Sequence, residues 1–235
     1  METTKLNSNI LYNYPIYTNN HSKTYLKNGV YYKLFKDTYK KEIDAKVKKI
    51  KLINSLGIKD QIVLGNVEMD GSIIGYAYEV ENYKNNQDLS VCSRNTKKKI
   101  HELELLKKKL EILHKNGIIH GDIRIRNLSL NNDEILFRDL DNVNIEDYSF
   151  NHSSRIQQSF INRYGIDEKL DDLAYNIAYI SHLNGVIEDV AIDYVINKGK
   201  LPKTLRCAEN EEIINAMITL NDKDAIKTFT IKKRH

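Results

Sequence analysis

Residues 118–128 read Ile-Ile-His-Gly-Asp-Ile-Arg-Ile-Arg-Asn-Leu, and residues 136–141 read Leu-Phe-Arg-Asp-Leu-Asp. The first segment carries Asp122 and, five residues later, Asn127; the second carries Asp139, twelve residues further on. Apolar pairs flank these polar positions, which is typical of a strand–loop–strand unit that holds polar side chains at the mouth of a nucleotide site. Asp122 can accept a proton from an incoming hydroxyl group, and Asn127 and Asp139 can hold Mg²⁺ against phosphates.

This spacing resembles the catalytic loop and metal-binding segment of the protein-kinase-like superfamily, whose patterns are H-x-D-x-x-x-x-N and D-F-G. The resemblance extends over about residues 16–184. It implies Mg²⁺ (or Mn²⁺) and ATP as cofactors, with Asp122 as the catalytic base or orienting carboxylate and His120 as a support of the loop. Arg124 is either the cation that neutralises the transferred phosphate or a generic basic loop residue.

Several positions depart from the family pattern. Gly121 stands where protein kinases usually have arginine, as in the His-Gly-Asp of aminoglycoside and choline kinases. Asp141 replaces the glycine of D-F-G, so it can bind a second metal ion or cap the next turn. No G-x-G-x-x-G precedes the first strands, and no A-P-E follows the loop. Residues 18–23 take the place of the glycine-rich loop, where the amides of residues 20–22, with Ser22 or Lys23, would cover the phosphates.

Further candidates lie upstream of the loop. Val30-Tyr-Tyr-Lys33 resembles the V-A-I-K element, in which the lysine reaches the phosphates. We expect Glu42 to be its ion-pair partner, with Asp44 as the other acid nearby. Residues 78–81, Tyr-Glu-Val-Glu, resemble the hinge. There the Glu79 carbonyl and the Glu81 N–H would hydrogen-bond adenine, and Tyr78 would be a bulky gatekeeper.

The order of predicted elements is that of a compact, two-lobed, α+β kinase-like fold. Residues 1–80 form a β-rich lobe, residues 81–88 a linker, and residues 89–235 a trimmed helical lobe. Predicted strands span 24–27, 30–35, 62–69, 72–80, 128–130 and 134–137, and predicted helices span 38–56, 96–116, 170–183, 186–197 and 211–219. Asp172, or else Asp171, would accept hydrogen bonds from the backbone of the catalytic loop, as the resemblance implies.

Composition limits the class of protein. The chain has 235 residues and a net charge of +4, and its only cysteines, Cys92 and Cys207, suggest neither a zinc site nor a disulfide framework. No apolar run is long enough for a membrane span, and the first residues do not resemble a signal peptide. We therefore expect a cytoplasmic protein without a membrane partner. Lysine runs at 97–99 and 107–109 fit the solvated face of an amphipathic helix better than nucleic-acid binding.

The expected activity is Mg·ATP-dependent phosphoryl transfer, and a serine/threonine protein kinase is favoured because of the position of Arg124. Residues 142–168 are aperiodic and hold Ser149, Ser153, Ser154 and Ser159, so autophosphorylation is one expected reaction beside a protein or peptide substrate. Two alternatives remain open: a small-molecule kinase of the aminoglycoside or choline type, and a nucleotide-binding pseudokinase that acts as an interaction module.

Overall fold

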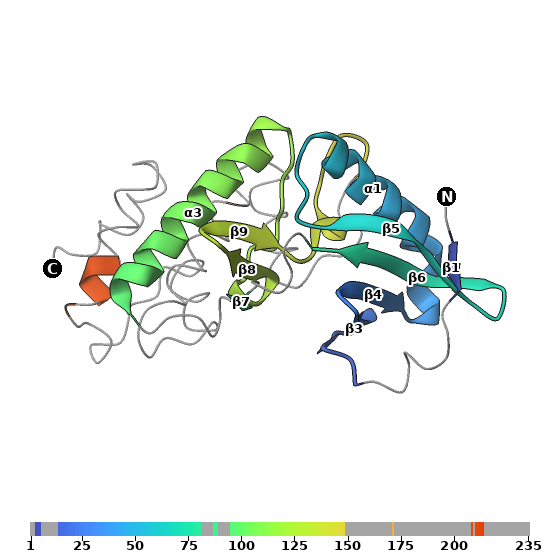
Figure 1. Ribbon diagram of the computed structural model, residues 1–235. Coiled ribbons are helices and arrows are strands. Elements are labelled where there is room, and N and C mark those ends of the chain that lie inside the picture. The colour runs from blue at the N-terminus through green and yellow to red at the C-terminus, as the bar shows by residue number, and fades with distance from the viewer. Residues whose placement is uncertain are drawn as a thin grey trace, which may run out of the picture. The chain divides into compact units, whose positions relative to one another are not determined.

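The computed structural model describes residues 3–5, 14–80, 87–88, 95–148, 171, 208 and 210–213. The chain packs as two compact units, the first formed by Met1–Asn86 with Phe137–Asn151 and the second by Gln87–Leu136 with His152–His235. A mainly antiparallel sheet and a few helices make up the described residues, which confirms the α+β class (Figure 1). The helices predicted after residue 169 lie almost wholly outside the described residues, although residues 171, 208 and 210–213 are helical.

The first unit contains a six-stranded sheet in the order β1-β5-β6-β4-β3-β2. Its strands are β1 (Thr3–Lys5), β2 (Tyr17–Thr18), β3 (Ser22–Lys27), β4 (Val30–Phe35), β5 (Ile62–Met69) and β6 (Ser72–Glu79). Neighbouring strands are antiparallel, except that β1 is parallel to β5. The turns Asn28-Gly29 and Asp70-Gly71 have positive φ at both central residues, as type I′ hairpins require. Both predicted hairpins are therefore confirmed, whereas the short strands β1 and β2 were not predicted.

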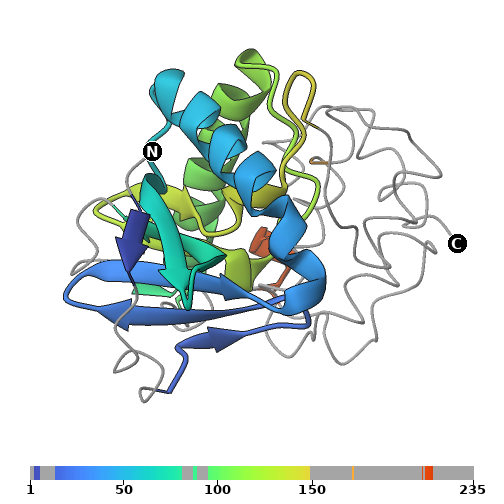
Figure 2. The same ribbon diagram turned by 90° about the vertical axis from the view of Figure 1, so that its right-hand side faces the viewer.

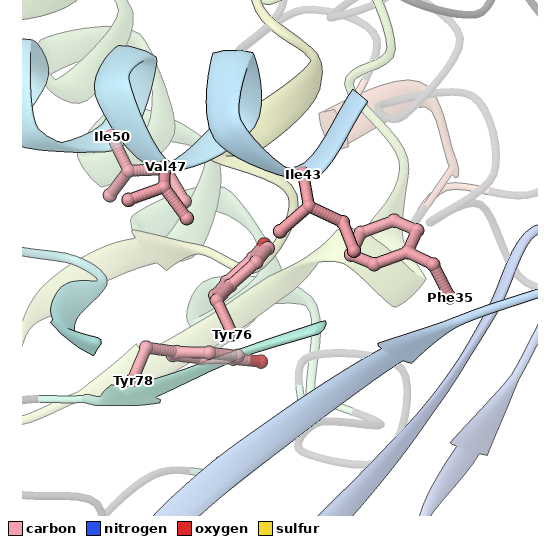
Figure 3. Packing of buried hydrophobic residues seen from close by; sticks show 6 residues of the cluster. All are labelled: Phe35, Ile43, Val47, Ile50, Tyr76 and Tyr78. Carbon is pink, nitrogen blue, oxygen red and sulfur yellow. The ribbon is translucent and has the colours of Figure 1, made fainter. Parts of the chain in front are cut away.

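Helix α1 (Ile43–Ser55) covers one face of this sheet and follows a 3₁₀ turn, η2 (Asp37–Glu42) (Figure 2). The predicted apolar stripe is buried as expected; it consists of Ile43, Val47, Ile50 and Ile53. Figure 3 shows three of these residues packed against Phe35, Tyr76 and Tyr78, which point from β4 and β6 toward the helix. The opposite face of the sheet buries Tyr25, Leu34, Val67, Ile74 and Ala77.

The second unit contains helix α3 (Thr96–Lys115) and a three-stranded sheet of β7 (Gln87–Asp88), β8 (Leu128–Asn131) and β9 (Glu134–Phe137). The side chain of Asn95 caps α3 by accepting a hydrogen bond from the Lys97 amide at 2.9 Å. A salt bridge of 3.0 Å between Lys109 Nζ and Glu134 Oε1 joins α3 to β9, and Figure 1 shows the helix beside this hairpin. Among the described residues, no helix is both long enough and apolar enough to cross a membrane.

Candidate functional site

Lys33 lies on β4 with its side chain on the same face of the sheet as α1. Alternation along the strand puts Tyr31, Lys33 and Phe35 on this face. Only 5% of Lys33 is exposed. The neighbouring strand β6 approaches very closely at Gly75, where an added Cβ would overlap the backbone carbonyl oxygen of Lys33. A glycine at position 75 thus fixes the spacing of the two strands at the point where Lys33 leaves the sheet.

Two carboxylates neutralise the ammonium group of Lys33. Its Nζ lies 2.9 Å from Asp139 Oδ1 and 2.8 Å from Asp141 Oδ1. Burial disfavours the charged lysine, but the two aspartates outweigh this effect and raise the pKa of Lys33 well above its ordinary value. The lysine predicted to bind phosphate and the aspartate predicted to bind metal therefore contact each other directly.

The expected ion pair between Lys33 and Glu42 is absent, so this prediction is wrong. Glu42 is the last residue of η2, and its Oε2 lies 3.9 Å from Lys46 Nζ, one turn further along the helix. The carboxylates that reach Lys33 come instead from the segment after β9. Glu42 immediately precedes α1, which made it a reasonable choice from the sequence. The actual partners, Asp139 and Asp141, lie more than a hundred positions from Lys33.

The two aspartates differ in their surroundings. The Asp139 side chain is 26% exposed, and its one ion-pair partner among the described residues is Lys33. The Asp141 side chain is 2% exposed and also lies 3.6 Å from Lys46 Nζ. Burial would raise the pKa of Asp141, but Lys33, Lys46 and Lys49 together hold it well below its ordinary value. Asp139 is thus the more accessible of the two carboxylates, and metal binding by Asp141 stays a prediction.

Side chains that the sequence analysis did not single out hold the segment around these aspartates. Asp60 Oδ2 accepts a hydrogen bond of 2.8 Å from the Phe137 amide. Gln61 donates from Nε2 to the Arg138 carbonyl at 2.6 Å and accepts from the Leu140 amide at 3.1 Å. Such residues have no sequence signature, because an Asp-Gln pair in a loop between a helix and a strand is unremarkable until its distant backbone partner is known.

Lys49 completes this attachment from α1. Its side chain is fully buried and Nζ donates a hydrogen bond of 2.7 Å to the Val143 carbonyl. Burial lowers the pKa of Lys49 to about 8, against the opposing effect of Asp141. Three residues of the first unit therefore fix the backbone from position 137 to 143 without using the carboxylates of Asp139 and Asp141.

In the second unit, the predicted catalytic loop brings three of its candidates together. Arg124 Nε donates to Asp122 Oδ1 at 2.6 Å, and Asn127 Nδ2 lies 3.2 Å from the Asp122 carbonyl oxygen and 3.4 Å from Oδ2. Asn127 belongs to a 3₁₀ turn, η4 (Ile125–Asn127), and is buried, whereas the Asp122 side chain is 26% exposed. The accessible carboxylate of Asp122 is thus oriented by two neighbours from its own loop.

Asp171 holds the beginning of this loop. Its carboxylate accepts hydrogen bonds from the backbone amides of His120 and Gly121, and it lies 3.0 Å from His114 Nε2. Gly121 has a φ of 74°, a conformation that side chains other than glycine adopt with strain. The scaffold role therefore falls to Asp171, which was the alternative candidate; Asp172, the preferred one, lies outside the described residues.

The loop before β3 differs from what was expected. Asn19 Oδ1 accepts hydrogen bonds from the His21 amide at 2.8 Å and from the Ser22 amide at 2.7 Å, which closes a turn on the loop itself. Ser22 is also buried, so its hydroxyl does not face outward. The amides of His21 and Ser22 are thus engaged by Asn19, and phosphate binding by residues 20–22 stays a prediction.

The predicted hinge is described only up to Val80. Tyr78 is buried and stacks on Tyr31 with a centroid distance of 5.1 Å, and burial raises its pKa above the ordinary value. Glu79 ends β6, in register with Val30 on one side and Ile62 on the other. Adenine binding by Glu79 stays a prediction, and Glu81 lies outside the described residues.

The candidate residues thus form two sets, one in each unit. Lys33, Asp139 and Asp141 meet in the first unit, and Asp122, Arg124 and Asn127 meet in the second. Within the part of the chain that the structure describes, no cluster of three or more His, Cys, Asp or Glu side chains is arranged to hold a metal ion. Comparison of the sequence with models of known protein families and with curated proteins gave no match.

Proposed function

We propose that this protein has a two-lobed, protein-kinase-like fold and transfers the γ-phosphate of ATP, with Mg²⁺, to serine or threonine hydroxyls of a protein. The observation that carries the proposal is the direct pairing of Lys33 with Asp139 at 2.9 Å. A buried lysine with an accessible aspartate beside it supplies the charges that a metal–nucleotide complex requires, a cation for phosphate oxygens and an anion for the metal.

The donor set fits Mg²⁺. This ion prefers oxygen ligands and is commonly held by one or two carboxylates together with substrate phosphates and waters, so a complete protein cage is not required. Asp139 offers such a carboxylate, and its side chain is 26% exposed. When bound, the ion would neutralise phosphate charge during transfer.

The residues of the catalytic loop support the same reaction. Asp122 is accessible and is oriented by hydrogen bonds from Arg124 and Asn127, so it can accept the proton of an acceptor hydroxyl. Asp171 anchors the loop backbone at His120 and Gly121, which limits its movement. Catalysis would then rest on positioning and charge neutralisation, without a covalent intermediate on the protein.

The experiment that tests this function follows the label of γ-labelled ATP. The purified protein is incubated with Mg²⁺ and labelled ATP, alone, with a mixture of protein substrates, and with aminoglycosides or aminoalcohols. Label on serine or threonine supports the proposal. Label on a small molecule would replace the protein acceptor by a small-molecule acceptor, and free labelled phosphate alone would contradict transfer to any acceptor offered.

A nucleotide-binding module without turnover is the second candidate, and one observation favours it. The amides of His21 and Ser22 are engaged by Asn19, so the loop that replaces the glycine-rich segment does not present them to phosphates in this conformation. ATP binding without any transfer of label would favour this candidate. The intact set of Asp122, Asn127 and Asp139 favours an active enzyme instead.

A further inference from the structure

The pairing of Lys33 leads to one further inference, which rests on the proposed function. We propose that Asp141 is the residue that positions Lys33 for phosphate binding, with Lys46 holding Asp141 in place, and that Asp139 alone is exchanged between Lys33 and the metal. Asp141, in the segment after β9, would then form the ion pair with Lys33 that was expected of Glu42.

The carboxylates of Asp139 and Asp141 differ in accessibility. The Asp139 side chain is 26% exposed, so an incoming metal ion can reach it. Once the metal binds Asp139, an N–H group of Lys33 becomes available to donate to a phosphate oxygen. The Asp141 side chain is 2% exposed, and its two oxygens are shared between Lys33 at 2.8 Å and Lys46 at 3.6 Å. Without Asp141, Lys33 would keep only the more exposed Asp139, and Lys46 would keep Glu42 at the longer distance of 3.9 Å. Losing one member of a buried ion pair is strongly unfavourable.

Helix α1 brings a second buried lysine to this region. It directs Lys46 toward Asp141, and the Lys46 side chain is only 3% exposed. Two buried lysines need an acid between them. Asp141 occupies this position and connects β4 to α1 through the two ion pairs.

The backbone that carries Asp141 is fixed independently of the Asp141 carboxylate. Gln61 bonds the chain at Arg138 and Leu140, and Lys49 bonds it at Val143. Asp141 lies between these attachments, and so it is delivered to Lys33 by a rigid segment. A residue supported in this way suits a permanent positioning role better than repeated exchange with a ligand.

Four proteins test the proposal: wild type, Asp141→Asn, Asp139→Asn and the control Asp37→Asn. Asp37 is also paired with a lysine, Lys40, at 2.7 Å, but its side chain is 94% exposed. The dissociation constant of ATP is measured by calorimetry with excess Mg²⁺ and again with EDTA. Asp141→Asn should weaken ATP binding by a similar factor in both conditions, at least about tenfold, the equivalent of 1.4 kcal/mol.

Asp139→Asn should behave differently. The affinity for metal-free ATP should be unchanged or higher, because a carboxylate that competes for Lys33 is removed. The increase in ATP affinity that Mg²⁺ causes in wild type should be lost. The control should match wild type in both conditions. If Asp141→Asn instead lost only the Mg²⁺-dependent part of the affinity, Asp141 would be a metal ligand and the proposal would be overturned.

Lys46→Met keeps the test decisive if Asp141→Asn does not fold. It removes the support of Asp141 but leaves both acids of Lys33 in the chain, so it should weaken ATP binding to a smaller extent and equally with and without Mg²⁺. Equal ATP affinity in Lys46→Met and wild type would then overturn the proposal. If wild type bound no ATP, both the proposed function and this inference would be overturned. If wild type bound ATP and the Asp141 and Lys46 variants bound it equally well, only this inference would be overturned.

Discussion

The ammonium group of Lys33 lies 2.9 Å from the carboxylate of Asp139, although 106 residues separate the two in sequence. This contact links the strand β4 to the segment after β9, and both belong to the first unit. A cation and an anion placed together in this way neutralise each other in the absence of ligand. They can be separated by a ligand that carries both charges, as a metal–nucleotide complex does.

Replacing Lys33 by methionine tests this relationship most directly. The variant Lys33→Met should lose binding of Mg·ATP, because the buried cation proposed to bind the phosphates is gone. Removing one partner of a buried pair should also lower the free energy of unfolding of the apo protein by about 3 kcal/mol. Thermal-shift titrations measure both effects, since wild type should gain about 2.7 kcal/mol when ATP is present at 100 times its dissociation constant.

Lys36→Met is the control for this prediction. Lys36 follows β4 directly and is exposed, so its loss should change neither the unfolding temperature nor the shift caused by Mg·ATP. Nucleotide binding by Lys33→Met at the wild-type affinity would remove Lys33 from the candidate site.

The turnover step should depend on Asp122 in a different way. Asp122→Asn keeps the size of the side chain but cannot accept the acceptor proton, so phosphoryl transfer should fall at least about a hundredfold. Binding of Mg·ATP should stay close to that of wild type. The measurement is single-turnover transfer of labelled phosphate alongside calorimetric binding; a wild-type transfer rate in the variant would show that another group is the base.

Local sequence patterns predicted most of the elements that carry these residues. The stripe at Ile43, Val47 and Ile50 predicted α1, and the Asn28-Gly29 turn predicted the β3–β4 hairpin, because both signals depend on neighbours within a few residues. The hydrogen bonds of the Asp122 loop are also local. For this reason its spacing could be recognised without knowledge of the tertiary structure.

Contacts between distant segments could not be predicted in the same way. Glu42 was chosen as the partner of Lys33 by its place in the helix, but Asp141 reaches Lys33 because Gln61 and Lys49 fix the backbone around it. The three-residue strand β1 is too short to show alternation. Its pairing with β5 depends on a neighbour more than sixty residues away.

Gly75 should be indispensable to the position of Lys33. Any Cβ at this site would overlap the Lys33 carbonyl oxygen and come within 3.0 Å of the Leu34 Cα, so β4 would have to move away from β6. Gly75→Ala should therefore lower the free energy of unfolding by about 2 kcal/mol, as overpacking usually does. It should also weaken binding of Mg·ATP.

Ser72→Ala serves as the comparison for Gly75→Ala, since Ser72 is exposed at the beginning of the same strand. Chemical denaturation of both variants gives the stabilities. A fully stable Gly75→Ala protein would mean that β4 and β6 can separate without cost, in which case the glycine does not set the position of Lys33.

The buried Lys49 should make stability depend on pH. Its pKa in the folded protein is lowered to about 8, so between this value and the ordinary value of 10.5 the unfolded chain binds more protons than the folded chain. Stability must therefore rise with pH in this window and be lost as pH falls through 8. The maximum slope for one group is about 1.4 kcal/mol per pH unit.

Denaturation of wild type and Lys49→Met at pH 7.5, 8.5 and 9.5 isolates this contribution, because other titrating groups cancel in the difference. The stability of wild type relative to the variant should increase with pH. A difference that stayed constant, or that fell with pH, would show that Lys49 is not buried as a destabilised cation. The lost hydrogen bond to the Val143 carbonyl shifts the difference at all pH values without changing its slope.

The acceptor itself should be found within the chain. The sequence between residues 142 and 168 is aperiodic and contains several serines. We expect their hydroxyl groups to reach the proposed active site of a neighbouring molecule. We expect autophosphorylation on serine, at one or more of Ser149, Ser153, Ser154 and Ser159, and its loss in Asp122→Asn.

Since Gly121 replaces the arginine that would receive such a phosphate, substitution of these serines by alanine should leave transfer to an added protein substrate within about twofold of wild type. Phosphosite mapping by mass spectrometry, on wild type and on Asp122→Asn, decides the matter. A phosphate that persists in Asp122→Asn would come from another kinase, and an unphosphorylated protein that still consumes ATP on an added aminoalcohol would be a small-molecule kinase.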